Sequence, residues 1–274
     1  MNVSLSSINV ENSSSFRWET GVVFSLNRNR ILRLTGLDAN GDGKEDDDRG
    51  NSWFIGKSLG ALYDYTIDGV LQSADSVWGK SFGFQPGDLI IRDISGPDGT
   101  PDGKITADDR SIVGYSVPNF TMNITNTLSY KNLQLYFDIN FIAGGGKNNY
   151  YLGSNLTGLN PAQLAPEVAT WLNLPYWTPA RQNDLYPRPN YGNPYGYRFY
   201  QSRSFARLQN LSLSYSIPAA LSKKWHFQNA RVFVSGRNLF TKTKWIGLDP
   251  ETGGTIGGSN PALRAFTIGF STSF

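Results

Sequence analysis

Apolar and polar residues alternate along several stretches of the chain, which is the pattern of β-strands whose two faces meet different surroundings. In FRWETGVVFSL (16–26), for example, Phe16, Trp18, Val22 and Phe24 fall on one face. The same alternation recurs in residues 119–130, 132–144, 211–217, 230–240 and 264–274. The pattern predicts about six long strands and an all-β, antiparallel fold.

The links between these stretches alternate strictly between short and long. SYKNL and PAALSKKWHFQN are short, whereas the links at about 34–115, 145–202 and 242–261 are long. Outer-membrane barrels have short periplasmic turns and long outside loops, and compact soluble domains seldom carry such long loops. A soluble β-sandwich also alternates along its strands, so the alternation alone leaves that fold open. The link lengths favour the barrel, with extracellular loops.

A membrane-spanning sheet must close on itself, because unpaired backbone groups in hydrocarbon are very costly. About six strands would leave two open edges, and even small bacterial barrels have about eight strands. We therefore expect the whole chain, 1–274, to be a segment of a larger barrel. The closing strand, RAFTIGFSTSF, would pair with the first strand of that barrel.

Composition excludes several classes of function. The net charge of +3 and the scattered basic residues do not favour nucleic-acid binding. The absence of cysteine excludes disulfides, thiol catalysis and thiolate metal sites. No apolar run is long enough for a transmembrane helix, and the start, MNVSLSSINVENSSS, lacks the features of a signal peptide.

The segment DGTPDGKITADD (98–109) matches the spacing of a calcium-binding loop, in which oxygen ligands recur along twelve residues around a central glycine. The predicted ligands are Asp98, Thr100, Asp102, the backbone carbonyl of Lys104, Thr106 and Asp109. Gly103 occupies the turn position. Aspartate at the last position reaches less far than the usual glutamate. The alternative is a solvated Asp-Gly turn that holds no ion.

A second segment, DANGDGKEDDD (38–48), matches the same spacing less well. Asp38, Asn40, Asp42 and Asp46 are correctly placed for calcium, but Arg49 occupies the last ligand position. The alternative is an acidic, solvated turn.

The link at 145–202 is rich in aromatic, amide and guanidinium groups, which together suit a sugar or peptide ligand. The candidate substrate-binding residues are Tyr150, Tyr151, Trp177, Arg181, Tyr186 and Tyr191. The simpler alternative is that these rings pack the interior of a large loop or meet a partner protein.

We expect no enzymatic activity. His226 is the only histidine, and it lies in a predicted short link beside two lysines, as a surface residue would. Neither a nucleophile-elbow motif nor a phosphate-binding glycine loop is present. Nothing in the sequence points to the carboxylate pair of a secreted glycoside hydrolase, although such a pair leaves no fixed motif.

Several stretches in order resemble the C-terminal part of SusC/RagA-like TonB-dependent outer-membrane transporters of Bacteroidetes. They are FIGKSLGALYDYTIDGV, DGKITADDRSIVGYSVPNFTMNITNTLSY, YWTPARQNDLYPRP, SFARLQNLSLSYSIP, RVFVSGRNLFTKTKWIGLDPETGG and the terminal strand. The resemblance covers nearly the whole chain. It implies the C-terminal portion of a transmembrane barrel of about 22 strands, with the plug and the N-terminal strands supplied by the rest of the polypeptide.

The resemblance also implies partners and a function. The implied function is the import of oligosaccharides or peptides. The implied partners are a SusD-type surface lipoprotein, the TonB complex, which would be reached through the plug, and outer-membrane lipid. In outer-membrane proteins generally, a terminal aromatic strand resembles the signal read by the barrel-assembly machinery, here Phe270 and Phe274. The alternative reading is a soluble, calcium-stabilised β-sandwich that binds carbohydrate.

Overall fold

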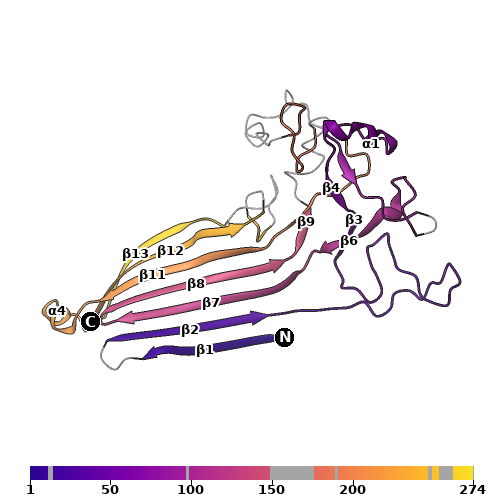
Figure 1. The fold of residues 1–274 in the computed structure, drawn as a ribbon. Helices are drawn as coiled ribbons and strands as arrows, with labels where there is room; N and C mark the ends of the chain where they lie inside the picture. The colour runs from indigo at the N-terminus through magenta and orange to yellow at the C-terminus, as the bar shows by residue number, and fades with distance from the viewer. Residues whose placement is uncertain are drawn as a thin grey trace.

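One large antiparallel sheet dominates the computed structural model of the chain (Figure 1). The structure describes residues 1–11, 15–96, 99–148, 176–188, 191–245, 249–252 and 262–273. The seven strands of the sheet, in spatial order, are β1 (Asn2–Glu11), β2 (Phe16–Ser25), β7 (Pro118–Tyr130), β8 (Leu133–Gly144), β11 (Phe205–Ser216), β12 (Asn229–Thr243) and β13 (Ala265–Ser273). Each strand pairs with the one before it in this series, so the sheet is a simple meander.

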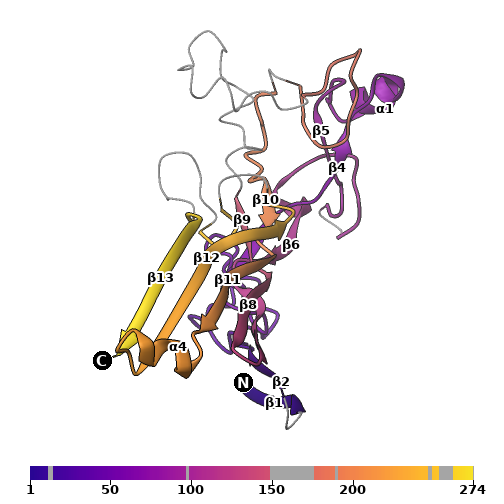
Figure 2. The ribbon, with the colours of Figure 1, turned by 90° about the vertical axis from the view of Figure 1, so that its left-hand side faces the viewer.

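The sheet is a single curved layer with two open edges, β1 and β13 (Figure 2). Within the described residues no second large sheet packs on it, because the three other sheets are two-stranded. A β-sandwich needs two facing sheets, so the sandwich alternative is wrong. The observed arrangement confirms an antiparallel segment of a larger barrel wall.

The first strand, β1, was missed by the sequence pattern, which predicted about six strands where the sheet has seven. Val3 and Leu5 alternate with polar residues, but the pairing of β1 with β2 shifts register between Ile8 and Val10. A bulge adds one residue and moves the following apolar side chain out of the simple period. The serine-rich sequence around it weakens the signal further.

Cross-strand pairing aligns the apolar positions into rows. One row runs from Val22 through Ile124, Ile139 and Leu208 to Phe240. Side chains on this apolar face remain exposed in the isolated chain. Phe240 is 61%, Phe266 76% and Ile268 79% exposed. Because soluble proteins rarely leave so large an apolar surface uncovered, this face requires a nonaqueous or protein neighbour.

The long connections gather at one end of the sheet, and the short ones at the other, where α4 (Ala219–Lys224) lies (Figure 1). The long connections contain small elements of their own. They are β3 (Ala61–Tyr65), β4 (Ile67–Val70), η1 (Ser73–Asp75), α1 (Ser76–Ser81), β5 (Leu89–Ile91), η2 (Ala107–Asp109), β6 (Arg110–Tyr115), β9 (Gly146–Asn148) and β10 (Tyr200–Ser202). Among the described residues, no helix is long and apolar enough to cross a membrane.

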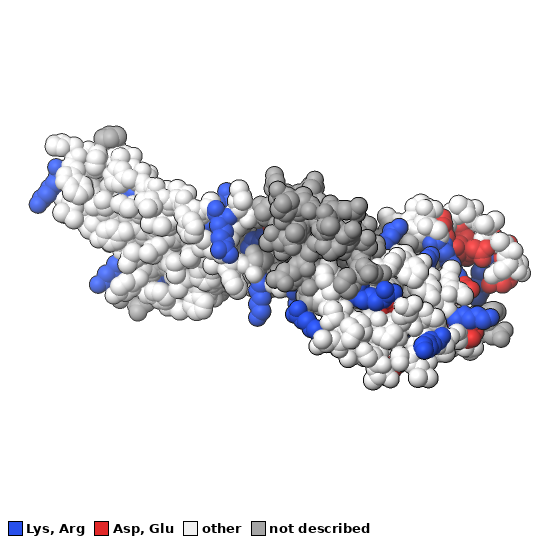
Figure 3. Space-filling view, turned by 90° about the horizontal axis from the view of Figure 1, so that it is seen from above, with Lys and Arg blue, Asp and Glu red and all other residues white. Residues whose placement is uncertain are grey.

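Charge is distributed unevenly between these two regions. In the view of Figure 3, the visible acidic side chains gather at the end that carries the long connections, while basic side chains are scattered over both ends. In this view the loop end therefore carries charges of both signs, which makes it, together with the polar face of the sheet, a candidate region for a polar ligand.

Candidate functional site: the polar face of the sheet and the loop cluster

The face opposite the apolar rows is lined with polar side chains. One of its rows, from β2 to β13, consists of Glu19, Thr127, Tyr136, Ser212, Ser235 and Thr267. Because side chains alternate along each strand, one face becomes apolar and the other polar over the whole sheet. Such a polar face suits the lumen of a barrel, where water or another protein segment is the neighbour.

A buried carboxylate lies on this polar face. Asp138 on β8 is 7% exposed, and its Oδ2 accepts hydrogen bonds from Asn210 Nδ2 at 2.6 Å and from the Tyr136 hydroxyl at 3.4 Å. Its Oδ1 is buried and has no hydrogen-bond partner among the described residues. A buried acceptor without a partner is costly, so Asp138 is a candidate contact for a donor from another segment.

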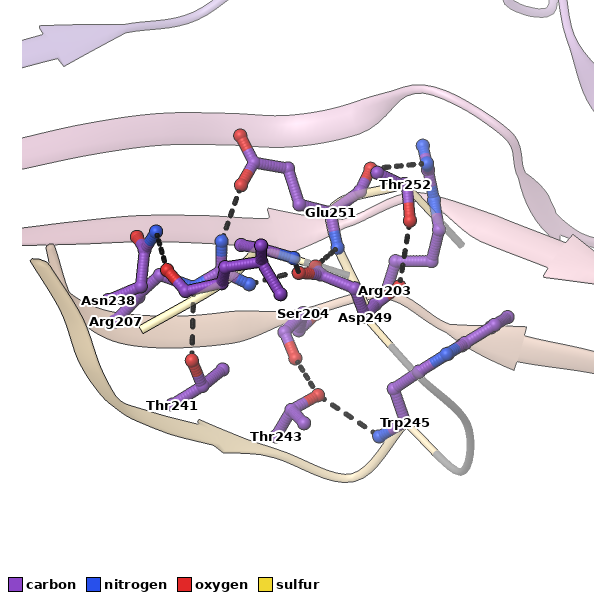
Figure 4. Close-up of polar contacts among 12 residues, drawn as sticks. Arg203, Ser204, Arg207, Asn238, Thr241, Thr243, Trp245, Asp249, Glu251 and Thr252 are labelled. Atoms are coloured by element: carbon purple, nitrogen blue, oxygen red, sulfur yellow. Dashed lines mark hydrogen bonds and ion pairs between the residues drawn. The ribbon is translucent and has the colours of Figure 1, made fainter. Parts of the chain in front are cut away.

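An ion-pair cluster fixes the connection that follows β12 against the polar face, as Figure 4 shows. Arg207 on β11 pairs through Nη2 with Asp249 Oδ1 at 2.8 Å and through Nη1 with Glu251 Oε2 at 2.7 Å. Its Nε donates to Thr241 Oγ1 at 3.0 Å, and its guanidinium lies 4.8 Å from the centre of the Phe205 ring. Each of the three guanidinium nitrogens of Arg207 therefore donates a hydrogen bond.

The Arg207–Asp249 pair is buried, since each side chain is only 4% exposed, whereas Glu251 is 49% exposed. Asp249 also accepts hydrogen bonds from the backbone N–H groups of Ala262 and Glu251. Burial by itself would raise the pKa of Asp249, but the hydrogen bonds from Ala262 and Arg207 hold that pKa below its usual range. The ionised Asp249 therefore binds Arg207 of the sheet and, through the backbone of Glu251 and Ala262, holds two segments of this connection close to the sheet.

The long connections form a compact cluster with its own hydrophobic core. Three of the predicted substrate-binding rings lie in this core: Trp177 is 4%, Tyr186 7% and Tyr191 2% exposed. They pack with Val70 and Leu89 of the first long connection. This is the packing role that the sequence left open as the simpler alternative. A contact with substrate stays a prediction for these residues.

Of the other predicted substrate-binding residues, Arg181 is exposed in a tight turn, where its backbone pairs with Thr178. Tyr150 and Tyr151 lie outside the described residues. An ion pair between Arg188 Nε and Asp88 Oδ1, at 2.7 Å, ties the second long connection to the first. The cluster is thus built jointly from two connections that are far apart in sequence.

Burial also affects the tyrosine hydroxyls in this cluster. Burial raises the pKa of Tyr197 to about 12 and raises the pKa of Tyr191 as well. The Tyr191 hydroxyl is enclosed and has no hydrogen-bond partner among the described residues. These rings remain neutral at physiological pH and contribute packing and not charge.

In the first predicted calcium loop, the described carboxylates bind backbone amides. Asp109 is fully buried; its Oδ1 accepts from Ile94 N at 2.8 Å and Ser95 N at 3.2 Å, and its Oδ2 accepts from Thr106 N at 2.7 Å. Burial alone would raise the pKa of Asp109, but the backbone donors keep it below its usual range. Asp98 lies outside the described residues.

The second loop has a similar arrangement. Asp38 accepts from the backbone N–H groups of Gly41, Asp42 and Gly43, and Asp46 accepts from Ala39 N. Searching the described part of the chain finds no group of three or more histidine, cysteine, aspartate or glutamate side chains placed to hold a metal ion. Calcium binding by either loop therefore stays a prediction.

The predicted assembly residue Phe270 lies on β13, is 54% exposed, and has its ring centre 6.0 Å from that of Phe227. Phe274 lies outside the described residues. The sequence analysis missed the Arg207 cluster. An arginine within the alternating stretch SFARLQNLSLSYS could have signalled a lumen-side anchor, but its acidic partners in LDPETGG are more than forty residues away.

Comparison with known proteins gives sequence relatives over nearly the whole chain. TonB-dependent receptor P3 of Formosa agariphila is 31% identical over 300 residues, which cover 99% of this chain and 28% of the relative. TonB-dependent receptor SusC of Bacteroides thetaiotaomicron is 26% identical and is matched over 96% of this chain and 25% of its own length. The chain thus spans about a quarter of the length of these relatives. No family model matches the chain.

Solved structures agree with the fold. The RagAB peptide importer in its closed-closed state superposes with a TM-score of 0.70 and 24% identity, over all of this chain and 29% of that one. The open-open state gives a TM-score of 0.69 with 22% identity. The sequence relatives and the matching barrel wall identify the chain as a SusC/RagA-like segment of a TonB-dependent receptor.

Proposed function

We propose that this chain forms part of the wall and outside loops of a TonB-dependent outer-membrane transporter that imports oligosaccharides or peptides. In this proposal the rest of the polypeptide supplies the plug, the other strands and the contact with the TonB complex. A SusD-type lipoprotein covers the loop end from outside the cell. The observation that carries the proposal is the 31% identity with a TonB-dependent receptor over 99% of the chain.

The geometry of the sheet supports this role. Its exposed apolar rows suit lipid tails, and its polar rows suit a lumen filled by the plug. The open edges of β1 and β13 require neighbouring strands, because unpaired backbone groups cannot face hydrocarbon. The unpartnered Oδ1 of Asp138 suits a lysine, arginine or backbone donor from the plug.

Two observations bear on the choice between oligosaccharide and peptide as the substrate. One structural neighbour is named the RagAB peptide importer, and one sequence relative is the TonB-dependent receptor SusC. Arg181 is one of the predicted substrate-binding residues. Its side chain is exposed in the loop cluster and can therefore contact a ligand from solution. A guanidinium forms charge-assisted hydrogen bonds with a peptide carboxylate, whereas a neutral sugar gains less from its charge.

Calcium remains part of the proposal as a structural ion in the 98–109 and 38–48 loops. The backbone hydrogen bonds of Asp109 and Asp38 fold these segments tightly, and an ion would add to that order by binding the remaining oxygens. Isothermal titration of the complete protein with calcium, after chelator treatment, tests this proposal. Absence of binding at millimolar calcium would reject it.

The test of the main proposal uses the complete receptor that contains this segment, expressed in a Bacteroidetes host. We expect it in the outer-membrane fraction, with slower gel migration after boiling, and we expect uptake of labelled oligosaccharide or peptide to depend on TonB. Arg181→Gln should reduce peptide uptake, while Arg231→Gln, an exposed control on β12 near the short-turn end of the sheet, should not. Recovery of the receptor in the soluble fraction, or TonB-independent uptake, would reject the proposal.

A further inference from the structure

A groove crosses the apolar face of the sheet at the end that carries the long connections. It has a volume of about 630 Å³ and is lined mainly by apolar groups. The side chains that matter are Phe120, Met122, Phe141, Ala206, Lys242 and Lys244. The groove therefore combines an apolar floor with two cations at one side.

The groove arises from the residues that share one cross-strand row. This row runs from Phe24 through Met122 and Phe141 to Ala206 and Lys242. The first three positions carry large side chains, whereas Ala206 carries only a methyl group, which leaves a depression in the surface. In the neighbouring row Ala143 continues the depression beside Phe120. A slender apolar chain fits such a depression better than a flat protein surface does.

The two lysines point to the same side as the groove. Thr243 lies between them and points to the opposite side, where its Oγ1 donates to the Ser204 carbonyl at 2.8 Å and accepts from Trp245 N at 3.0 Å. Trp245 is 6% exposed. Because neighbouring side chains of an extended chain alternate, Lys242 and Lys244 project toward the apolar face.

Both lysines are exposed, and neither forms an ion pair within the described part of the chain. Lysine side chains at the boundary of an apolar surface lay their methylene stems on that surface and place the ammonium group in the polar layer. Two such groups beside an apolar groove are complementary to a molecule with a hydrocarbon tail and an anionic head.

We propose that this groove binds a lipid with a phosphate head group, whose acyl chain lies on Phe120, Met122, Phe141 and Ala206. Lys242 and Lys244 bind the phosphate. The inference rests on the proposed function, in which the apolar face meets the outer membrane, and it adds a specific lipid site to that face. A neutral lipid would fill the groove equally well but would leave both cations without a partner.

The test is native mass spectrometry of the complete receptor, released from micelles that contain phosphatidylglycerol and phosphatidylcholine with identical acyl chains. About a tenfold to thirtyfold preference for the anionic lipid is expected, since each surface lysine contributes about a factor of five. The variant Lys242→Gln/Lys244→Gln should lose this preference. The control, Lys223→Gln/Lys224→Gln, changes two exposed lysines at the opposite end of the sheet and should keep it.

A second variant tests the groove itself. Ala206→Phe fills the depression without changing charge and should reduce retention of both lipids at this site. Equal retention of the two lipids by the wild type, or an unchanged preference in the lysine variant, would overturn the proposal. A bound protein chain displacing lipid from the groove would overturn it as well. Failure of the receptor to enter detergent micelles would instead count against the proposed function.

Discussion

The buried ion pair between Arg207 and Asp249 offers the sharpest test of how the loop end is held on the wall. In Arg207→Met the side chain keeps a similar length and apolar stem but loses its charge and its donors. Asp249, whose side chain is 4% exposed, would then be a buried carboxylate without a cation. The contact to the half-exposed Glu251 contributes little by comparison, because exposed pairs are screened by water.

The magnitude follows from what Asp249 retains. Breaking a buried pair by removing one partner costs about 3–5 kcal/mol. Asp249 keeps the backbone donors of Ala262 and Glu251, which continue to solvate its charge. The lower end, about 3 kcal/mol, is therefore expected for the local opening of this connection, and this corresponds to a factor of roughly 150 in its equilibrium constant.

Hydrogen exchange of the complete receptor in detergent measures this opening directly. The backbone N–H groups of Ala262 and Glu251 donate to Asp249, so their exchange reports release of the anchor. In Arg207→Met these amides should exchange roughly a hundred times faster, while amides in β8 stay unchanged. Adding Asp249→Asn should restore part of the protection, because an amide is neutral and removes the buried unpaired charge. Its single oxygen can replace only one of the two carboxylate oxygens that accept from Glu251 N and Ala262 N, so the protection should not return fully.

An increase of less than about fivefold in Arg207→Met would refute the reasoning, since it would mean that the ion pair contributes no more than an exposed one does. If Arg207→Met and Arg207→Met/Asp249→Asn exchanged at the same rate, the faster exchange could not be caused by the unpaired carboxylate of Asp249. General loss of protection in β8 would indicate failure of the sheet, and a milder variant, Arg207→Lys, would then serve as the test.

Three further predictions concern the loop cluster. Gly87→Ala should lower its thermal stability by about 2 kcal/mol or more, because φ is +90° there and a Cβ would lie 2.5 Å from the Trp177 ring; tryptophan fluorescence on heating measures the change. Tyr191→Phe should leave stability within about 1 kcal/mol of the wild type or raise it, since the buried hydroxyl has no partner among the described residues, and the same melting curve would show a large loss if that is wrong. The pKa of Asp109 is lowered on folding, so its stabilisation is complete above the unfolded pKa of about 4 and is lost as pH falls through the folded pKa; proteolysis of the 94–109 segment by pepsin should rise over that range, and Asp109→Asn should remove this dependence.

The long sheet could be predicted from sequence because its strands are specified locally. Alternating stretches such as FRWETGVVFSL and NLQLYFDINFIAG fix which residues share a face, whatever the neighbours are. The bulge in β1 shows the limit of this signal. One inserted residue near Ile8 interrupts the alternating pattern, so β1 is recognised only from its pairing with β2.

The loop end could not be predicted in the same way. Trp177, Tyr186 and Tyr191 have the composition of a binding surface, and only the packing against Val70 and Leu89 shows that their rings are buried. The reason is that burial in a long connection depends on which other connection covers it, and that partner lies about a hundred residues away.

The sequence by itself determined the sheet strands other than β1, their two-faced character and the alternation of short and long links, since these follow from side-chain period and local turn chemistry. Only the tertiary structure decided which loop residues are buried, that Arg207 and Asp249 form an anchor, and that Ala206 and two lysines border one groove. These features depend on cross-strand register and on contacts between distant segments, and a linear pattern contains neither.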